Sequence, residues 1–172
     1  MALEINRLTN ALLWIDGKNY LGKIEEVNLP APKYKMAEYK ALGLQGVMEY
    51  YSGIDKMEMK LKINAPYKDL MRNIGNPLVK YKMMLRASLE SYASGTRIGE
   101  IPYVVYVTAS PKDFPLGNFK QNDNVELEMN FSVFAVKLEI GGEKLYEIDQ
   151  EANVFIVGGL DILAQYRANL GL

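Results

Sequence analysis

Hydrophobic and polar residues alternate with a period of two along much of the chain, a pattern typical of β-strands with one buried and one exposed face. The clearest runs lie at Met57–Ile63, Val79–Leu89, Tyr103–Ser110 and Val125–Ile140, with shorter strands expected at Leu12–Ile15, Tyr20–Leu29, Lys144–Ile148 and Val154–Val157. Asp16-Gly17 and Gly141-Gly142 separate apolar runs and predict hairpin turns. Because only one face of each strand is apolar, we expect an antiparallel sheet that is covered on one side.

Two of these runs exceed the usual strand length of about 5–6 residues. In Val125–Ile140 the apolar positions also switch from odd to even numbers around Ser132–Ala135. Such a switch predicts a β-bulge, or a strand that passes from one packing environment into another.

Two short helices fit the remaining pattern. Pro66 at a first turn and Gly75 at the end delimit one helix. Asp161 can cap a second helix that ends before Gly171. With no repeat, low-complexity tract or linker between these elements, we expect residues 1–172 to form a single domain that is mainly β.

The composition narrows the possible functions. The 172 residues carry 20 basic and 21 acidic side chains, and they include no histidine and no cysteine. A thiolate nucleophile, a zinc site with sulfur ligands and a histidine general base are therefore excluded, and we expect no enzyme activity, no metal and no cofactor. The N-terminus has no signal-peptide pattern, and no run approaches the roughly 18 apolar residues of a membrane span. We therefore expect synthesis in a cytoplasm-like compartment and no membrane insertion by the monomer.

The charges are unevenly distributed along the chain. Asp55–Arg86 holds eight basic and three acidic residues, whereas Gln121–Glu151 holds eight acidic and two basic ones. Neighbouring strands of one sheet could pair these charges within the subunit. Alternatively, the basic edge of one subunit could meet the acidic edge of the next.

Individual motifs give weak signals. Glu126 and Glu128 share a strand face and could hold a cation, but solvated carboxylates are the usual reason for such a pair. Gly158-Gly159 lacks the rest of a phosphate-binding fingerprint and indicates a turn. The run Lys33–Lys40 mixes lysine and tyrosine, yet without net positive charge it favours an exposed strand or an interface segment over a nucleic-acid site.

The edges of the predicted sheet need protection from uncontrolled pairing. A monomer could close the sheet into a small barrel around a ligand. A ring of subunits could instead join its sheets edge to edge into one wide barrel with a water-filled channel. The polar faces carry Lys, Glu, Asn and Ser, which favours the channel.

Two blocks of the chain closely resemble the major tail tube protein of contractile-tailed bacteriophages. The first block comprises Asn10–Gly22, Glu25–Pro30, Lys35–Tyr39 and Gly43–Gly46. The second comprises Val136–Gly142, Tyr146–Asp149, Asn153–Asp161, Ala164, Arg167 and Asn169–Leu172. Residues of about 48–124 resemble this family mainly in pattern. The chain departs from it in having Leu44 where methionine is common and Gly158 where a polar residue is common.

This resemblance implies a structural protein of the virion whose fold is an antiparallel β-sandwich or barrel-like domain. Members of the family form hexameric rings that stack into the inner tube of a contractile tail. Sheath contraction drives this tube through the target cell envelope, and phage DNA passes through its lumen. The implied partners are further copies, the sheath protein, the tape measure protein, tail terminator and baseplate proteins, and transiently DNA. Two alternatives are the tube of a headless phage-tail-like bacteriocin and, in a different class, a monomeric ligand-binding β-barrel.

The polar faces of the predicted strands supply candidates for the lumen lining: Glu58, Lys60, Lys62, Lys80, Lys82, Arg86, Glu126, Glu128, Asn130 and Ser132. Five of these are basic and three acidic, an awkward balance for a DNA conduit. Either some of the lysines point outward or into subunit contacts, or the face assigned to the lumen is wrong for at least one strand, which is the outcome we expect. Contacts between rings are expected from Met1–Asn10, Tyr39–Gly53, Pro111–Asn122 and Leu172. Within these segments, the candidate contact residues are Tyr39, Tyr50, Tyr51, Phe114, Phe119 and Leu172.

Overall fold

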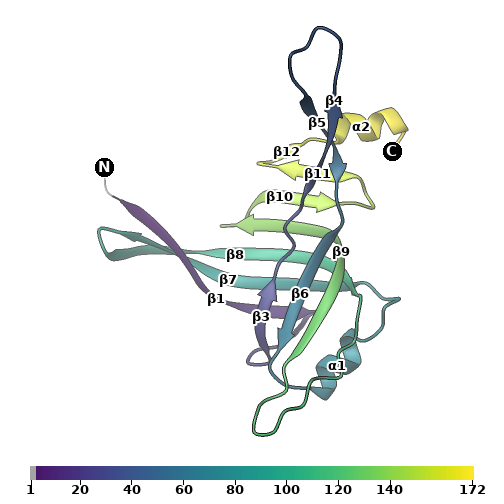
Figure 1. Cartoon of the computed structure of the whole chain (residues 1–172). Helices are drawn as coiled ribbons and strands as arrows, with labels where there is room; N and C mark the ends of the chain where they lie inside the picture. Colours follow the sequence, from purple (N-terminus) through teal and green to yellow (C-terminus); the bar gives the residue numbers. More distant parts are fainter. Residues whose placement is uncertain (1–2) are drawn as a thin grey trace.

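The computed structural model describes residues 3–172, so Met1 and Ala2 of the first predicted contact segment lie outside the described residues. Figure 1 shows the elements in chain order: β1 (Glu4–Ile15), β2 (Lys18–Asn19), β3 (Ile24–Asn28), β4 (Tyr34–Tyr39), β5 (Met48–Ile54), β6 (Met57–Ile63), α1 (Lys68–Ile74), β7 (Tyr81–Ala93), β8 (Thr96–Pro111), β9 (Leu127–Ile140), β10 (Glu143–Asp149), β11 (Val154–Val157), β12 (Leu160–Asp161) and α2 (Ala164–Leu170).

The strands form one large sheet and one separate hairpin. The large sheet runs in the order β12-β11-β10-β9-β8-β7-β1-β2, with β3 joined to β6 and β6 to β9. Strands β4 and β5 pair only with each other. Each of the paired strands in the described chain is antiparallel to its neighbour. The predicted fold class, mainly β and antiparallel with short helices, is confirmed.

The large sheet folds over on itself and encloses the core between two layers. Strands β3, β6 and the first half of β9 lie in front of β1, β7 and β8 in Figure 1. The alternating apolar residues of β6, among them Met59 and Leu61, are buried against those of β7 and β8, among them Met83 and Val107. Helix α1 closes one end of this sandwich with Leu70 and Ile74, both fully buried. The polar residues that alternate with these positions consequently face away from the core on both layers.

Strand β9 changes its neighbour at the position where its sequence pattern shifts. Its first half pairs with β6 up to Val133, and its second half pairs with β10 from Ala135 onward. On the other side, β8 pairs with both halves, and its register shifts so that Phe134 is left without a partner residue. The extra residue reverses which positions point into the core, from Phe131 and Val133 to Val136. The predicted bulge and change of environment are both present.

The predicted turns and helices are also present. Asp16 and Gly17 have φ of 47° and 78°, and Gly141 and Gly142 have φ of 62° and 85°, as a two-residue hairpin turn of this type requires. Helix α1 ends at Gly75 as predicted, but it starts at Lys68 with Tyr67 as its N-cap, so Pro66 precedes the helix and does not lie in its first turn. Helix α2 starts later than expected, at Ala164, because Asp161 belongs to β12; its carboxylate still accepts a hydrogen bond from the Leu163 N–H at 3.1 Å.

Some predicted strand boundaries are wrong. Val79 lies outside β7 and is 41% exposed, and the strand continues past Leu89 to Ala93. The predicted strand at Tyr20–Leu29 is reduced to β3, because residues 20–23 form a turn in which the Lys23 N–H donates to the Tyr20 carbonyl. The pattern of apolar and polar residues does not show where the hydrogen bonds between strands begin and end.

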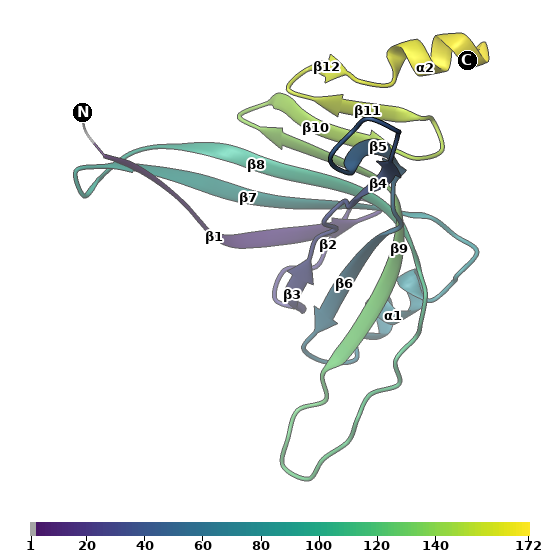
Figure 2. The same ribbon diagram turned by 45° about the horizontal axis from the view of Figure 1, so that its top comes forward.

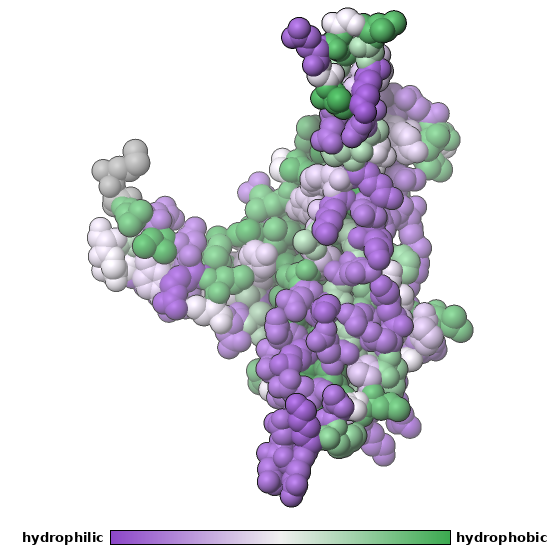
Figure 3. All heavy atoms as spheres, in the orientation of Figure 1, coloured by the Kyte–Doolittle hydropathy of each residue, from purple (hydrophilic) through white to green (hydrophobic). Residues whose placement is uncertain are grey.

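Three parts of the chain project from the sandwich. The outer halves of β1, β7 and β8 form an arm on one side, the β4–β5 hairpin projects at one end, and the connection between β8 and β9, residues 112–126, projects at the opposite end (Figures 1 and 2). Hydrophobic residues lie on the surface of the arm and at the tip of the hairpin (Figure 3). Exposed apolar surfaces of this kind commonly mark contact sites.

Candidate functional site

Most of the predicted lumen residues share one surface, the outer face of β6 and the first half of β9. Glu58 lies opposite Ser132, Lys60 opposite Asn130, and Lys62 opposite Glu128. Glu126 directly precedes β9 and reaches the same surface through an ion pair with Lys62. This surface, which we call the β6–β9 face, therefore unites Glu58, Lys60, Lys62, Glu126, Glu128, Asn130 and Ser132.

The charges of the β6–β9 face are paired. Lys60 Nζ lies 2.7 Å from Glu128 Oε1, and Lys62 Nζ lies 3.1 Å from Glu25 Oε1 and 2.9 Å from Glu126 Oε2. The hydrogen bonds that the Lys62 ammonium donates to these two carboxylates, Glu126 first, raise the pKa of Lys62. No lysine in these pairs presents an uncompensated positive charge.

Glu58 occupies a site of its own on the same face. Its Oε1 atom lies 2.6 Å from Lys112 Nζ and 3.0 Å from Lys56 Nζ. These two ammonium groups, Lys112 first, lower the pKa of Glu58 to about 2. Nearby, Asn130 is held by Asp113, which accepts hydrogen bonds from its backbone and its side-chain amide at 2.9 and 2.6 Å.

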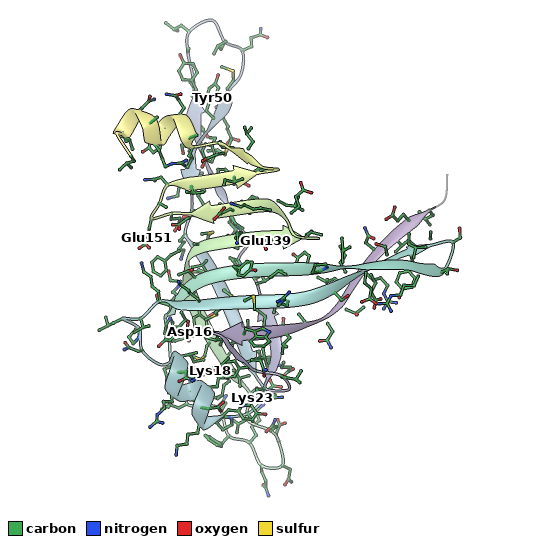
Figure 4. The ribbon with its side chains drawn as sticks, turned by 180° about the vertical axis from the view of Figure 1, so that it is seen from behind. Asp16, Lys18, Lys23, Tyr50, Glu139 and Glu151 are labelled. Atoms are coloured by element: carbon green, nitrogen blue, oxygen red, sulfur yellow. The ribbon has the colours of Figure 1, made fainter. Side chains whose placement is uncertain are left out.

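The remaining predicted lumen residues lie elsewhere. Lys82 and Arg86 are exposed on the outer face of β7, which belongs to the other layer of the sandwich. Lys80, just before β7, forms an ion pair with Glu151 and places its ammonium 4.6 Å from the centre of the Phe134 ring. Figure 4 shows Glu151 at the edge of the molecule, beside the turn that connects β10 and β11. The ten candidates therefore do not form one surface, since the outer faces of two packed layers point in opposite directions.

The basic and acidic stretches of the sequence form ion pairs with each other within the subunit. Lys60–Glu128, Lys62–Glu126 and Lys80–Glu151 each join the basic stretch of residues 55–86 to the acidic stretch of residues 121–151. This arrangement agrees with pairing between neighbouring strands, the first of the two interpretations of the sequence.

The candidate contact residues between rings lie on the projections. Tyr39, Tyr50 and Tyr51 belong to the β4–β5 hairpin and are 51%, 54% and 43% exposed. Phe114 and Phe119 lie in the connection of residues 112–126, at the opposite end of the molecule (Figure 1). Leu172 follows α2 at the hairpin end. The candidates thus divide between the two ends.

The arm is a feature that the sequence analysis missed. Ser94 and Gly95, with φ of 49° and 80°, connect β7 to β8 at its tip. In the arm Leu8 lies opposite Leu89, which lies opposite Ile101 on its other side. The continued alternation of Leu85, Ala87 and Leu89, followed by Ser-Gly, is the signal that could have revealed it.

The described residues contain no group of three or more Asp and Glu side chains placed to hold a metal ion. Neither described helix is long and apolar enough to cross a membrane. What the described surface offers chemically is strand edges, paired charges and exposed apolar side chains.

Comparison with known proteins shows which protein family this chain matches. The family model for phage tail tube protein FII matches residues 5–171. The tail tube protein of Escherichia phage P2 is 23% identical over 166 residues, which cover 93% of this chain and 94% of the P2 protein.

Two cryo-EM structures share the fold. A chain of the sheath–tube complex of the extracellular contractile injection system PVC, in its extended state, has a TM-score of 0.58 at 13% identity and covers 75% of this chain and 87% of its own. A chain of the PVC sheath/tube terminator has a TM-score of 0.55 at 14% identity, covering 75% and 92%. The match to the family model spans nearly all of the chain, which therefore belongs to the phage tail tube protein FII family and is a structural subunit of a tail tube.

Proposed function

We propose that this chain, acting as one tail-tube domain of residues 1–172, forms hexameric rings that stack into the inner tube of a contractile phage tail. The observation that carries the proposal is the arm, whose apolar face extends beyond the sandwich that would cover it. Leu8 and Ile101 are 46% and 42% exposed there, on either side of the half-buried Leu89.

A second copy of the chain is the occupant that fits this face. The arm continues the apolar side of the same sheet whose other part packs on the core, so it is matched to a sandwich layer of the same kind. In the arm, β1 and β8 each pair only with β7, which leaves their outer edges free for hydrogen bonds with another strand. A ring closes all such edges, whereas a monomer leaves them exposed.

Stacking of the rings follows from the placement of the other projections. The β4–β5 hairpin with Tyr39, Tyr50 and Tyr51 projects at one end, and the connection with Phe114 and Phe119 projects at the other. Two different contact surfaces at opposite ends form a heterologous interface, which repeats without limit when it does not close into a ring. We infer that these residues, together with Leu172, form the contacts between successive rings.

In this function the subunit is a non-catalytic part of a wall. The sheath protein surrounds the tube, the tape measure protein occupies it during assembly, and terminator and baseplate proteins bound its ends. DNA passes through the lumen without sequence recognition. The subunit is assembled in the host cytoplasm and does not itself insert into a membrane. The PVC relatives in fold come from a sheath–tube complex and a sheath/tube terminator, which supports the sheath and terminator as partners.

The lumen is lined by one of the two groups of polar residues described above. Either group suits a DNA conduit only if its positive charge is balanced, because free lysines bind phosphate and would retard the DNA. The ion pairs of Lys60 and Lys62 supply that balance on the β6–β9 face.

The test compares the assembly of arm variants with that of the unaltered chain. Electron microscopy of the purified protein should show rings and tubes, and light scattering should show growth with concentration. The double variant Leu8→Gln, Ile101→Gln should lower the tube yield at least tenfold, because it places polar groups in the buried contact between copies.

Arg7→Gln is the matched control, since Arg7 is an exposed neighbour of Leu8 on the alternate face of the same strand. Circular dichroism should show that all three proteins are folded. A chain that remains monomeric at every concentration, or tubes that form normally from the double variant, would contradict the proposal. The first outcome would favour the monomeric ligand-binding barrel.

A further inference from the structure

Within the described residues 3–172, the β4–β5 hairpin is connected to the large sheet only at its base. Its strands form a two-stranded sheet of their own, and every residue of β4 is exposed. At the base, the Asp55 N–H donates to the Lys33 carbonyl at 2.8 Å, and Gln150 Nε2 donates to the Asp55 carbonyl at 3.2 Å. The direction in which the hairpin projects must therefore depend on side-chain contacts near this base.

Four aromatic side chains supply those contacts. The rings of Tyr34 and Tyr51, from β4 and β5, lie with their centres 5.8 and 6.3 Å from that of Phe155 on β11. Tyr146 on β10 packs edge-on against Phe155 at 5.8 Å, and its hydroxyl lies 3.0 Å from that of Tyr34. Phe155 is only 5% exposed. We call these residues the aromatic clasp.

The hydroxyl groups of the clasp lie in a partly desolvated site. Burial, followed by the hydrogen bond with Tyr34, raises the pKa of Tyr146. Burial also raises the pKa of Tyr51. The hydroxyls of Tyr146 and Tyr51 therefore stay protonated in the neutral and mildly alkaline range.

A cavity lies beside the base of the hairpin. Its volume is about 450 Å³, and it is lined by Tyr51–Ile54 of β5, by Ile148–Gln150 at the end of β10, and by Leu163 and Tyr166 at α2. The ladder is also irregular here, with a register shift between Lys35 and Met36 opposite Gly53, whose φ is 143°. A bulge beside an open cavity gives the hairpin room to tilt, so the clasp is its main lateral support.

We propose that the aromatic clasp is a positioning device that fixes the direction of the β4–β5 hairpin relative to the sheet. Its consequence for assembly rests on the proposed function, in which Tyr39 and Tyr50 of the hairpin contact another ring. A hairpin held in one direction meets that ring without first losing conformational freedom, which favours association.

The absence of cysteine allows a direct test. Spin labels attached to Gly46→Cys, at the hairpin tip, and Glu143→Cys, at the start of β10, report the distance between hairpin and sheet by pulsed electron paramagnetic resonance. Both sites are exposed. We expect one narrow distance distribution in the otherwise unaltered chain. The double variant Tyr146→Phe, Phe155→Leu should at least double its width or shift its centre.

Tyr50→Phe is the matched control, because Tyr50 pairs with Tyr39 near the tip, at 6.1 Å between ring centres, and takes no part in the clasp. Tyr146→Phe alone retains the ring and tests the clasp if the double variant fails to fold. An unchanged distribution in the folded clasp variants would overturn the proposal. A widened distribution together with normal tubes would confirm the clasp and contradict only the stacking role of the hairpin.

Discussion

Charged residues on the β6–β9 face act in small groups and not as single charges. Lys62 lies between Glu25 and Glu126, and Glu58 lies between Lys56 and Lys112. Exposed ion pairs of this kind add little to stability because water and salt screen them, so their main effect is on the local charge that the surface presents. The chain contains no histidine, and this charge therefore does not change around neutral pH.

Acidification should reveal the pairing of Glu58. Its pKa in the folded protein, about 2, lies below the ordinary value of 4.5, so the ion pairs stabilise the fold fully above pH 4.5 and are lost as the pH falls through about 2. We expect the melting temperature of the unaltered chain to exceed that of Glu58→Gln slightly at pH 6, and the difference to vanish near pH 2. Thermal melts at low salt measure this, and added salt should reduce the difference. A difference that is the same at both pH values would contradict the assignment. Ser132→Ala, on the same face, is the control.

At the scale of the elements, the sequence predicts best where the packing partner lies in the same chain. The alternation of apolar and polar residues in β6 and its shift in β9 could both be read from the sequence. Both strands bury their apolar side chains, such as Met59 and Phe131, in the core of the same subunit. The β4–β5 hairpin could not be recognised as a separate element, and the arm had only the alternation up to Leu89 and the following Ser-Gly as its signal. Leu8 and Tyr50 lie on surfaces that no layer of the described subunit covers, so alternation there does not show which face is buried. The shared surface of Lys60 and Glu128 likewise followed from the strand pattern, whereas the opposite position of Lys82 required the three-dimensional fold.

The connection between β8 and β9 owes its shape to a glycine. Gly117 has φ of 96°, and a Cβ atom there would lie 2.5 Å from Val125 Cγ1 and 3.1 Å from Leu127 Cδ2. Gly117→Ala should therefore lower the free energy of unfolding by about 1–3 kcal/mol, through backbone strain and a steric clash. Gly46→Ala, where nothing lies within 4 Å, is the matched control and should change it by less than about 0.5 kcal/mol. Urea unfolding measures both, and equal midpoints would show that this connection tolerates the strain.

At the scale of the whole molecule, each assembly role corresponds to a different direction of the fold. The arm extends sideways from one layer, and the hairpin and the connection of residues 112–126 lie at opposite ends (Figures 1 and 2). A ring that uses the sides and a stack that uses the ends leave the two outer faces free. In the proposed tube, one of these faces would point toward the lumen and the other toward the sheath.

This division predicts different reactivity for the two groups of lumen candidates. Lys60→Cys and Lys82→Cys each place a single thiol in the chain, one on the outer face of each layer. In assembled tubes without sheath, a maleimide attached to a long polymer should modify one of the two thiols at least tenfold more slowly than the other, because the lumen excludes the polymer. A small maleimide should reach both, and the disassembled subunit should react equally at both sites with either reagent. Equal protection from the polymer in tubes would show that the two faces do not point in opposite radial directions. A clear difference assigns the lumen to the protected face, since the two outer faces of one sandwich cannot both line the same channel.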